Sequence, residues 1–118
     1  MDNNEILQVI ANACDDKRAE DIVALDMQDV SLMADYFLVC HGSNERQVQA
    51  IAGAIKETME ETDIHVKRME GFEQARWILV DLDDIVCHIF HEDERYYYNL
   101  ERLWGDASRI ELHIAGSR

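Results

Sequence analysis

Apolar residues recur at the spacing of an α-helix in two long segments of the chain, residues 3–18 and 44–59. Asn3 or Asn4 is placed to cap the first helix, and Asn44 with Gln47 has the spacing of a capping box at the start of the second. The predicted buried faces are Ile6, Leu7, Ile10, Ala11 and Cys14 in the first helix, and Val48, Ile51, Ala52, Ile55 and Met59 in the second.

Shorter apolar or alternating runs predict five strands, at residues 21–26, 35–40, 64–69, 77–82 and 85–90. A tight acidic turn at Asp83 and Asp84 joins the last two strands into a hairpin. Helices interleaved with strands predict an α/β fold, and the hairpin makes the sheet mixed. We therefore expect a single domain at residues 1–108, with a mixed five-stranded sheet flanked by helices. Residues 109–118 form a C-terminal tail, in which alternating apolar residues suit an added strand or a disordered end.

The strand at 77–82 carries two different rows of side chains. One row is Ile78, Val80 and Leu82, and the opposite row is Trp77, Leu79 and Asp81. The first row is uniformly apolar, so it should be the better buried. We predict that the second row contacts a partner protein.

A third helix should follow the hairpin and carry more aromatic surface than it can bury. At about 100° per residue, its core face consists of Tyr96, Tyr97, Leu100, Leu103, Trp104 and Ala107. Tyr98 points nearly the opposite way, with Arg95 and Arg102 close to it on the helix surface. Such a tyrosine is either a singly exposed aromatic or an interface anchor. We predict that Tyr98, together with Arg95, contributes to partner binding.

Composition limits the class of protein and of partner. The chain has 118 residues, of which 47% are hydrophobic and 31% charged, as in a globular protein with a core. It has no apolar run near the ~20 residues that span a bilayer and no basic signal-peptide start. The three widely spaced cysteines suit a reducing cytoplasm. A net charge of −14 disfavours nucleic acid and anionic membranes and favours a basic protein partner, although acidity can also serve solubility alone.

No set of residues predicts catalysis, a cofactor site or a metal site. Cys40 with His41 and Cys87 with His88 resemble pairs of metal ligands, but neighbours on a strand point to opposite faces. Neither a glycine-rich phosphate loop nor a nucleophilic serine motif is present. The cysteines are better explained as small buried apolar residues.

A weaker motif leaves one alternative open. Gly42 and Ser43, with Asp81 and Asp83, resemble the glycine-serine turn and Asp-x-Asp strand with which nucleotidyltransferases hold a metal-bound triphosphate. In those enzymes the two elements lie close along the chain, whereas here a long helix and another strand separate them. The alternative function is therefore a divergent nucleotidyltransferase-like nucleotide-binding protein or enzyme.

Two blocks of motifs carry a resemblance to the ribosomal silencing factor family, also called Iojap-like. Residues 19–48, AEDIVALDMQDVSLMADYFLVCHGSNERQV, resemble its first block. The second block is matched by Glu70-Gly71, Trp77, Asp81, His88-Ile89-Phe90 and the run YNLERLW at 98–104. The chain departs from the family pattern at Asp83 in place of a turn glycine, at His41 in place of a threonine, and in the order of Ser43 and Asn44.

The resemblance implies a non-enzymatic protein with a nucleotidyltransferase-like fold that lacks the active site. Members of the family bind ribosomal protein fourteen of the large subunit, block association with the small subunit and repress translation. Isolated members tend to form homodimers, so this chain is expected to do so when free. A dimeric scaffold for another basic partner is a third reading of the same features.

Overall fold

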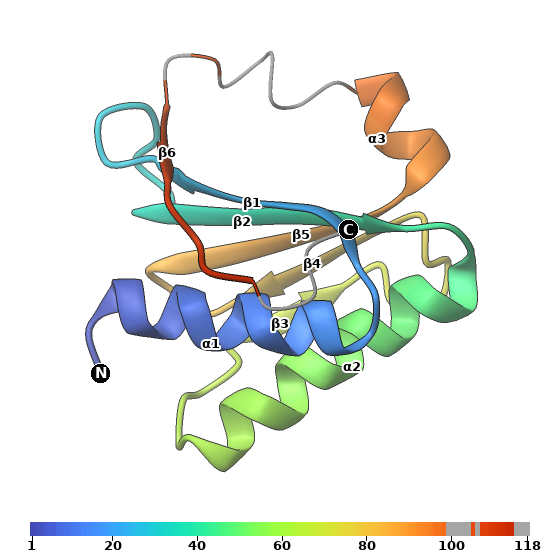
Figure 1. Ribbon diagram of the computed structural model, residues 1–118, viewed down its shortest axis with the longest axis horizontal. Helices are drawn as coiled ribbons and strands as arrows, with labels where there is room; N and C mark the ends of the chain where they lie inside the picture. Colours follow the sequence, from blue (N-terminus) through green and yellow to red (C-terminus); the bar gives the residue numbers. More distant parts are fainter. Residues whose placement is uncertain (99–104, 106, 115–118) are drawn as a thin grey trace.

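The computed structural model describes residues 1–98, 105 and 107–114, and for residues 96–98 it describes the backbone only. In chain order the elements are α1 (Asn3–Asp16), β1 (Glu20–Asp26), β2 (Tyr36–Gly42), α2 (Glu45–Glu61), β3 (Arg68–Glu70), β4 (Trp77–Asp81), β5 (Ile85–His91), α3 (Glu92–Tyr98) and β6 (Ser108–Ile110). The predicted α/β domain with a mixed sheet flanked by helices is confirmed (Figure 1). In the described part of the chain, no helix combines the length and apolar character needed to cross a bilayer.

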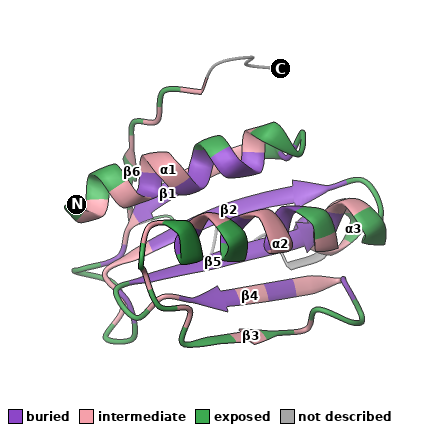
Figure 2. Ribbon diagram, turned by 90° about the horizontal axis from the view of Figure 1, so that it is seen from below, coloured by how far each residue is buried: buried purple, intermediate pink, exposed green. Residues whose placement is uncertain are grey.

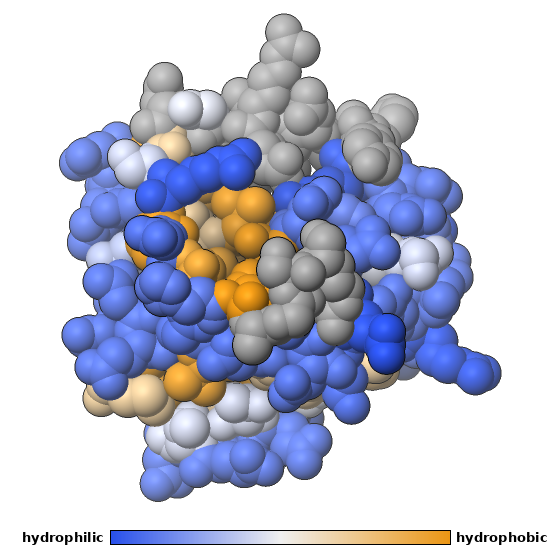
Figure 3. Space-filling view, in the orientation of Figure 1, coloured by the Kyte–Doolittle hydropathy of each residue, from blue (hydrophilic) through white to orange (hydrophobic). Residues whose placement is uncertain are grey.

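The sheet has six strands rather than the predicted five, in the order β3-β4-β5-β2-β1-β6. The additional strand is β6, which pairs antiparallel with β1 so that Ile110 lies opposite Ala24 and Ser108 opposite Asp26. The sequence left an added strand or a disordered end open for the tail, and the added strand is the one observed, because the free edge of β1 supplies the hydrogen bonds that order it. Ile110 and Leu112 pack against the core at this edge. Figure 3 shows an apolar area beside β6 on a mostly hydrophilic side of the molecule.

Pairing at the centre of the sheet is parallel. β2 and β5 run side by side from Tyr36 opposite Ile85 to Gly42 opposite His91. The other neighbouring strands pair antiparallel. At the opposite edge from β6 lies β3, which is shorter than the strand predicted at 64–69 but occupies an edge as expected.

α1 and α2 cover one face of the sheet, with their exposed sides turned outward (Figure 2). The predicted inner face of α2 is confirmed at every position, since all five of its residues are buried. In α1, four of the predicted five are buried, and Ile6 is partly buried. Asn44 caps α2 as predicted, with its Oδ1 atom accepting the N–H of Gln47 at 2.8 Å. The cap of α1 is Asp2 rather than Asn3 or Asn4, and its Oδ1 atom accepts the N–H of Glu5 at 2.9 Å.

The hairpin turn between β4 and β5 contains a strained residue. Leu82 donates its N–H to the carbonyl oxygen of Ile85 at 2.8 Å, which closes the turn around Asp83 and Asp84. Asp83 has φ of 81°, in the left-handed region that glycine adopts without a Cβ clash. Asp81 supports the turn, because its Oδ1 atom accepts the N–H of Asp83 at 2.8 Å.

We predict that Asp83→Gly stabilises the protein by up to about 1 kcal/mol. Glycine relieves a left-handed conformation that costs other residues about 1–2 kcal/mol. Part of this gain is lost because glycine also raises the conformational entropy of the unfolded chain. Loss of the exposed Lys67–Asp83 ion pair, at 3.5 Å, should matter little. Urea unfolding measures the difference.

The reverse exchange, at a glycine with positive φ, is the control. Gly71 has φ of 79°, and a Cβ atom there would lie 2.3 Å from the carbonyl oxygen of Trp77. Gly71→Ala should therefore lower the free energy of unfolding by more than about 1 kcal/mol. If Asp83→Gly proves equally destabilising, the turn is not strained.

Candidate partner-binding face

The face of the sheet opposite α1 and α2 carries a second, smaller apolar cluster. Its buried members are Leu25, Met27, Ala34, Phe37, Val39, Val86 and Phe90, and the partly buried Val23, Trp77, Leu79 and Ala107 pack against them. In Figure 1, α3 lies above one end of this face. We call this surface the Trp77 face.

β4 divides its side chains between the two faces as its alternation predicts. Ile78 and Val80 are fully buried against the helices, whereas Trp77 and Leu79 are half-buried on the Trp77 face. The prediction that the Ile78 row is the better buried is therefore confirmed at Ile78 and Val80, whereas Leu82, which follows the end of β4, is partly buried. The role of Trp77 and Leu79 in binding a partner stays a prediction.

The Trp77 ring is held in place by neighbouring rings on β5. Its Nε1–H group donates to Nδ1 of His88 at 3.1 Å, and its ring centroid lies 5.0 Å from that of Phe90. On the other side of His88, the ring of Phe37 makes an edge contact at 4.6 Å. Aromatic contacts of this kind and the hydrogen bond restrict Trp77 to one orientation. A partner would thus meet a preorganised surface.

His88 adds no charge to this face. It is 4% exposed, and burial lowers its pKa from 6.5 to about 4. Because the Trp77 indole can only donate, the hydrogen bond assigns the acceptor lone pair to Nδ1 and the ring proton to Nε2. The imidazole is therefore neutral near pH 7.

Asp81 and Arg95, which were predicted to contact the partner, are buried and make bonds within the chain. Asp81 is 8% exposed, and its Oδ2 atom lies 3.2 Å from Nε of Arg68. Arg95 is 7% exposed, and its Nη1 atom donates to the carbonyl oxygen of Asp21 at 2.8 Å. The expectation that Arg95 lies on the exposed side of its helix was wrong, because the layout of a single helix does not show what packs beside it. The side chain of Tyr98 lies outside the described residues, as do those of Tyr96, Tyr97, Leu100, Leu103 and Trp104.

A bulge in β1 creates the acceptors that Arg95 uses. The register of β1 against β2 shifts between Glu20 and Val23, and Asp21 has φ of 48°. A bulge frees backbone groups from the ladder, and the carbonyl oxygens of Glu20 and Asp21 accept from the guanidinium. The same guanidinium contacts Nδ1 of His41 at 2.9 Å. α3 is thereby fastened to β1 and β2.

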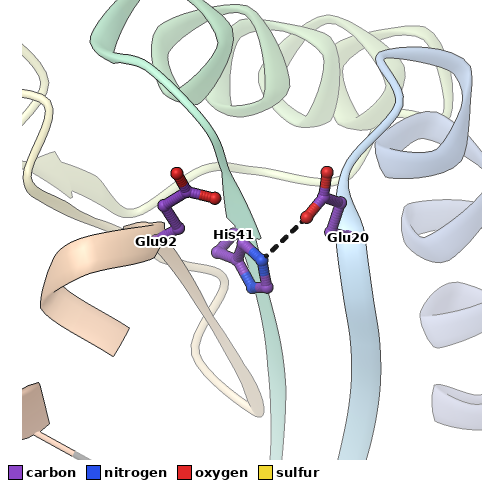
Figure 4. Close-up of side chains that lie close together, drawn as sticks. All are labelled: Glu20, His41 and Glu92. Atoms are coloured by element: carbon purple, nitrogen blue, oxygen red, sulfur yellow. Dashed lines mark hydrogen bonds and ion pairs between the residues drawn. The ribbon is translucent and has the colours of Figure 1, made fainter. Parts of the chain in front are cut away.

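Glu20, His41 and Glu92 form one group of candidate metal ligands in the described part of the chain (Figure 4). Their ligand atoms lie within 4.8 Å of one another, and Nε2 of His41 is 3.1 Å from Oε2 of Glu20. Sequence reasoning missed this group because its members come from β1, β2 and α3. A metal on Nε2 of His41 would require the ring proton to be on Nδ1. Arg95 already points an N–H donor at Nδ1, so a proton there would leave two donors facing each other. The group is therefore better explained as a set of contacts that join β1, β2 and α3 than as a metal site.

The cysteine–histidine pairs are separated as predicted. Cys40 and Cys87 are buried in the core beneath the helices, whereas His41 and His88 face the other side of the sheet. All three cysteines are free. Burial raises the pKa of Cys87, and hydrogen bonding with Cys40 together with burial raises that of Cys14. These residues are therefore unreactive thiols rather than thiolates.

The two halves of the nucleotidyltransferase-like motif lie at opposite ends of the sheet. Gly42 pairs with His91 at the end of β5, whereas Asp81 pairs with Val86 near its start. At 3.3 Å per residue these positions are about 17 Å apart. Gly42 and Ser43 therefore do not share one triphosphate-metal site with Asp81 and Asp83.

Comparisons with known proteins agree with this fold. A family model described as "Ribosomal silencing factor during starvation" matches residues 1–118. Ribosomal silencing factor RsfS of Bacillus subtilis is 62% identical over 112 residues, which cover 95% of this chain and 95% of that protein. A crystal structure from Bacillus halodurans is 56% identical, with a TM-score of 0.83 over 93% of this chain and 100% of the other. One from Chromobacterium violaceum is 29% identical, with a TM-score of 0.86 over 100% and 98%.

The neutral state of His88 predicts how stability depends on pH. Between pH 6.5 and about 4 the unfolded chain binds a proton at His88 that the folded chain does not. Stability should therefore be lost as pH falls through this window, by about 3 kcal/mol at most at 1.36 kcal/mol per pKa unit. Urea unfolding from pH 7 to pH 4 measures the loss.

Two variants isolate this contribution. His88→Gln keeps an acceptor for Trp77 but removes the titrating group, so its stability should vary less with pH than that of the wild type. His65→Gln changes an exposed histidine and should leave the profile unchanged. Parallel profiles for the wild type and His88→Gln would contradict the assignment.

Proposed function

The chain belongs to the ribosomal silencing factor family, and on this premise we propose that it binds the large ribosomal subunit and prevents the small subunit from joining. Membership carries a ribosome-associated role in silencing translation, which is regulatory rather than catalytic. We propose that the direct partner is ribosomal protein fourteen of the large subunit and that the encounter takes place in the cytoplasm.

The observation that supports this proposal is an apolar, aromatic surface on a strongly acidic chain. Trp77 and Leu79 are half-buried on a face where His88 is neutral, while the net charge of the whole chain is −14. Ribosomal proteins are commonly basic, so charge complementarity would bring the two surfaces together. Aromatic anchors then supply most of the contact energy.

The predicted contact residues would play different parts. We propose that Trp77 and Leu79 touch the partner directly, with Tyr98 adding a contact at the end of α3. Asp81 would support that surface through the β4–β5 turn, and Arg95 through its hydrogen bonds to β1.

Size gives this binding a steric consequence. The molecule measures 33 × 32 × 29 Å along its principal axes. A body about 30 Å thick, fixed on the surface where two subunits meet, keeps apart groups that must approach within about 4 Å to make contact. Silencing by this route requires no chemical reaction.

Two further expectations concern the free protein. We propose that it forms a homodimer when not bound to the ribosome, through an edge strand or an apolar patch such as the area beside β6. The nucleotide-binding alternative predicts heat on titration with magnesium and nucleotide. We expect no such heat, because Gly42 and Asp81 lie too far apart to hold one nucleotide.

Sedimentation of purified subunits tests the proposal. Saturating protein should reduce the fraction of joined ribosomes, and binding to free large subunits and to isolated ribosomal protein fourteen should weaken as salt rises. Unchanged subunit joining at saturation would overturn the silencing mechanism.

Variants of the Trp77 face test where binding occurs. Trp77→Ala and Leu79→Ala should each weaken binding to the large subunit by about fivefold or more, the loss expected when an anchor is truncated. Phe72→Ala is the matched control, because Phe72 is a 40% exposed aromatic whose carbonyl oxygen is bonded to Gln49 of α2. It should bind within about twofold of the wild type. Equal losses in all three variants would argue against the Trp77 face.

A further inference from the structure

The loop between β1 and β2, residues 27–35, displays large apolar side chains that nothing in the fold requires to be outside. Leu32 is 107% exposed, Met33 81% and Val30 40%. Leu32 and Met33 are the two most exposed large apolar residues in the described part of the chain. Single exposed apolar residues are ordinary, but three within four positions on one loop mark a contact surface.

The loop holds these side chains outward because its backbone is fixed. Ser31 donates its N–H to the carbonyl oxygen of Met27 at 2.8 Å, and Met27 donates to that of Asp35 at 2.8 Å, which closes the base of the loop. Asp35 in turn donates to the carbonyl oxygen of Asp84 in the β4–β5 turn at 2.9 Å. A prearranged loop loses little conformational entropy on binding.

Two buried residues at the ends of the loop connect it to the Trp77 face. Met27 is fully buried and Ala34 is 6% exposed, and both belong to the apolar cluster that includes Trp77 and Leu79. In Figure 1 the loop rises from the end of the sheet on the same side as α3. One partner can therefore cover the Trp77 face and reach the loop.

The charge around the loop indicates the chemistry of that partner. Between Arg18 and Arg46 the sequence contains no lysine or arginine, whereas Asp26, Asp29 and Asp35 lie in or beside the loop. Nearby, Lys67 is paired with Asp83, and β6 brings Arg109 opposite Leu25. An apolar tip with an acidic rim complements an apolar pocket bordered by lysine and arginine.

We propose that this loop is a second anchor for the basic protein of the large subunit, with Leu32 and Met33 entering an apolar pocket in its surface. The inference rests on the proposed function and adds to it a contact outside the Trp77 face. A second copy of this chain fits less well, since it would bring the same acidic rims together. An anionic lipid surface is disfavoured for the same reason.

Loop variants measured against the wild type test the inference. Leu32→Ser and Met33→Ser should each weaken binding to the large subunit about tenfold, with unchanged melting temperature because neither side chain packs within the chain. Leu32→Met preserves an apolar tip and should bind within about twofold. Asp29→Asn should slow association and reduce its dependence on salt.

The outcomes separate this inference from the proposed function. Loss of subunit binding by Leu32→Ser at full stability supports the second anchor. If the wild type and Leu32→Ser bind equally well, the loop is not an anchor, although the proposed function stands. If the wild type fails to bind, both are overturned. A shift in the dimer equilibrium or in vesicle binding, with subunit binding unchanged, would assign the loop to a second copy or to lipid and overturn the inference.

Discussion

Parallel pairing of β2 with β5 is the constraint on which the rest of the structure depends. The two strands meet along their whole length, and nearly every side chain on them is buried on one face or the other. Parallel neighbours cannot be joined by a tight turn, so the chain between them must cross over the sheet. Here it does so through α2 and returns through β3 and β4. With α1 packed beside α2, both long helices lie on one face.

This arrangement makes the two faces of the sheet unequal. The helical face closes over a large apolar core that also holds all three cysteines. The other face has a smaller cluster, in which Trp77 and Leu79 stay half-buried. Burial keeps His88 neutral and its hydrogen bond orients Trp77, so the face remains apolar and ordered. A chain of net charge −14 thus keeps one mainly apolar surface.

Two of the residues predicted to bind a partner make contacts within the chain that hold this surface in shape. The carboxylate of Asp81 fixes the β4–β5 turn and also lies beside Arg68. The guanidinium of Arg95 joins the start of α3 to the bulge in β1 and to His41. Buried charged groups need such partners, since an unpaired charge in the interior is costly. Their substitution would therefore disturb the surface indirectly.

Local patterns in the sequence determined the elements built from near neighbours along the chain. The buried face of α2, the Asn44 cap, the β4–β5 hairpin and the two rows of β4 follow from periods of 3.6 and 2, and the motif order placed the chain in its family. Tertiary structure decided what depends on distant partners. Of the two readings that the sequence left open for the tail, the strand β6 forms because β1 has a free edge. Arg95 is buried because the bulge at Asp21 faces it, and Glu20, His41 and Glu92 meet across three elements. Periodicity records which way a side chain points from its own element, whereas burial and pairing depend on which elements pack beside it.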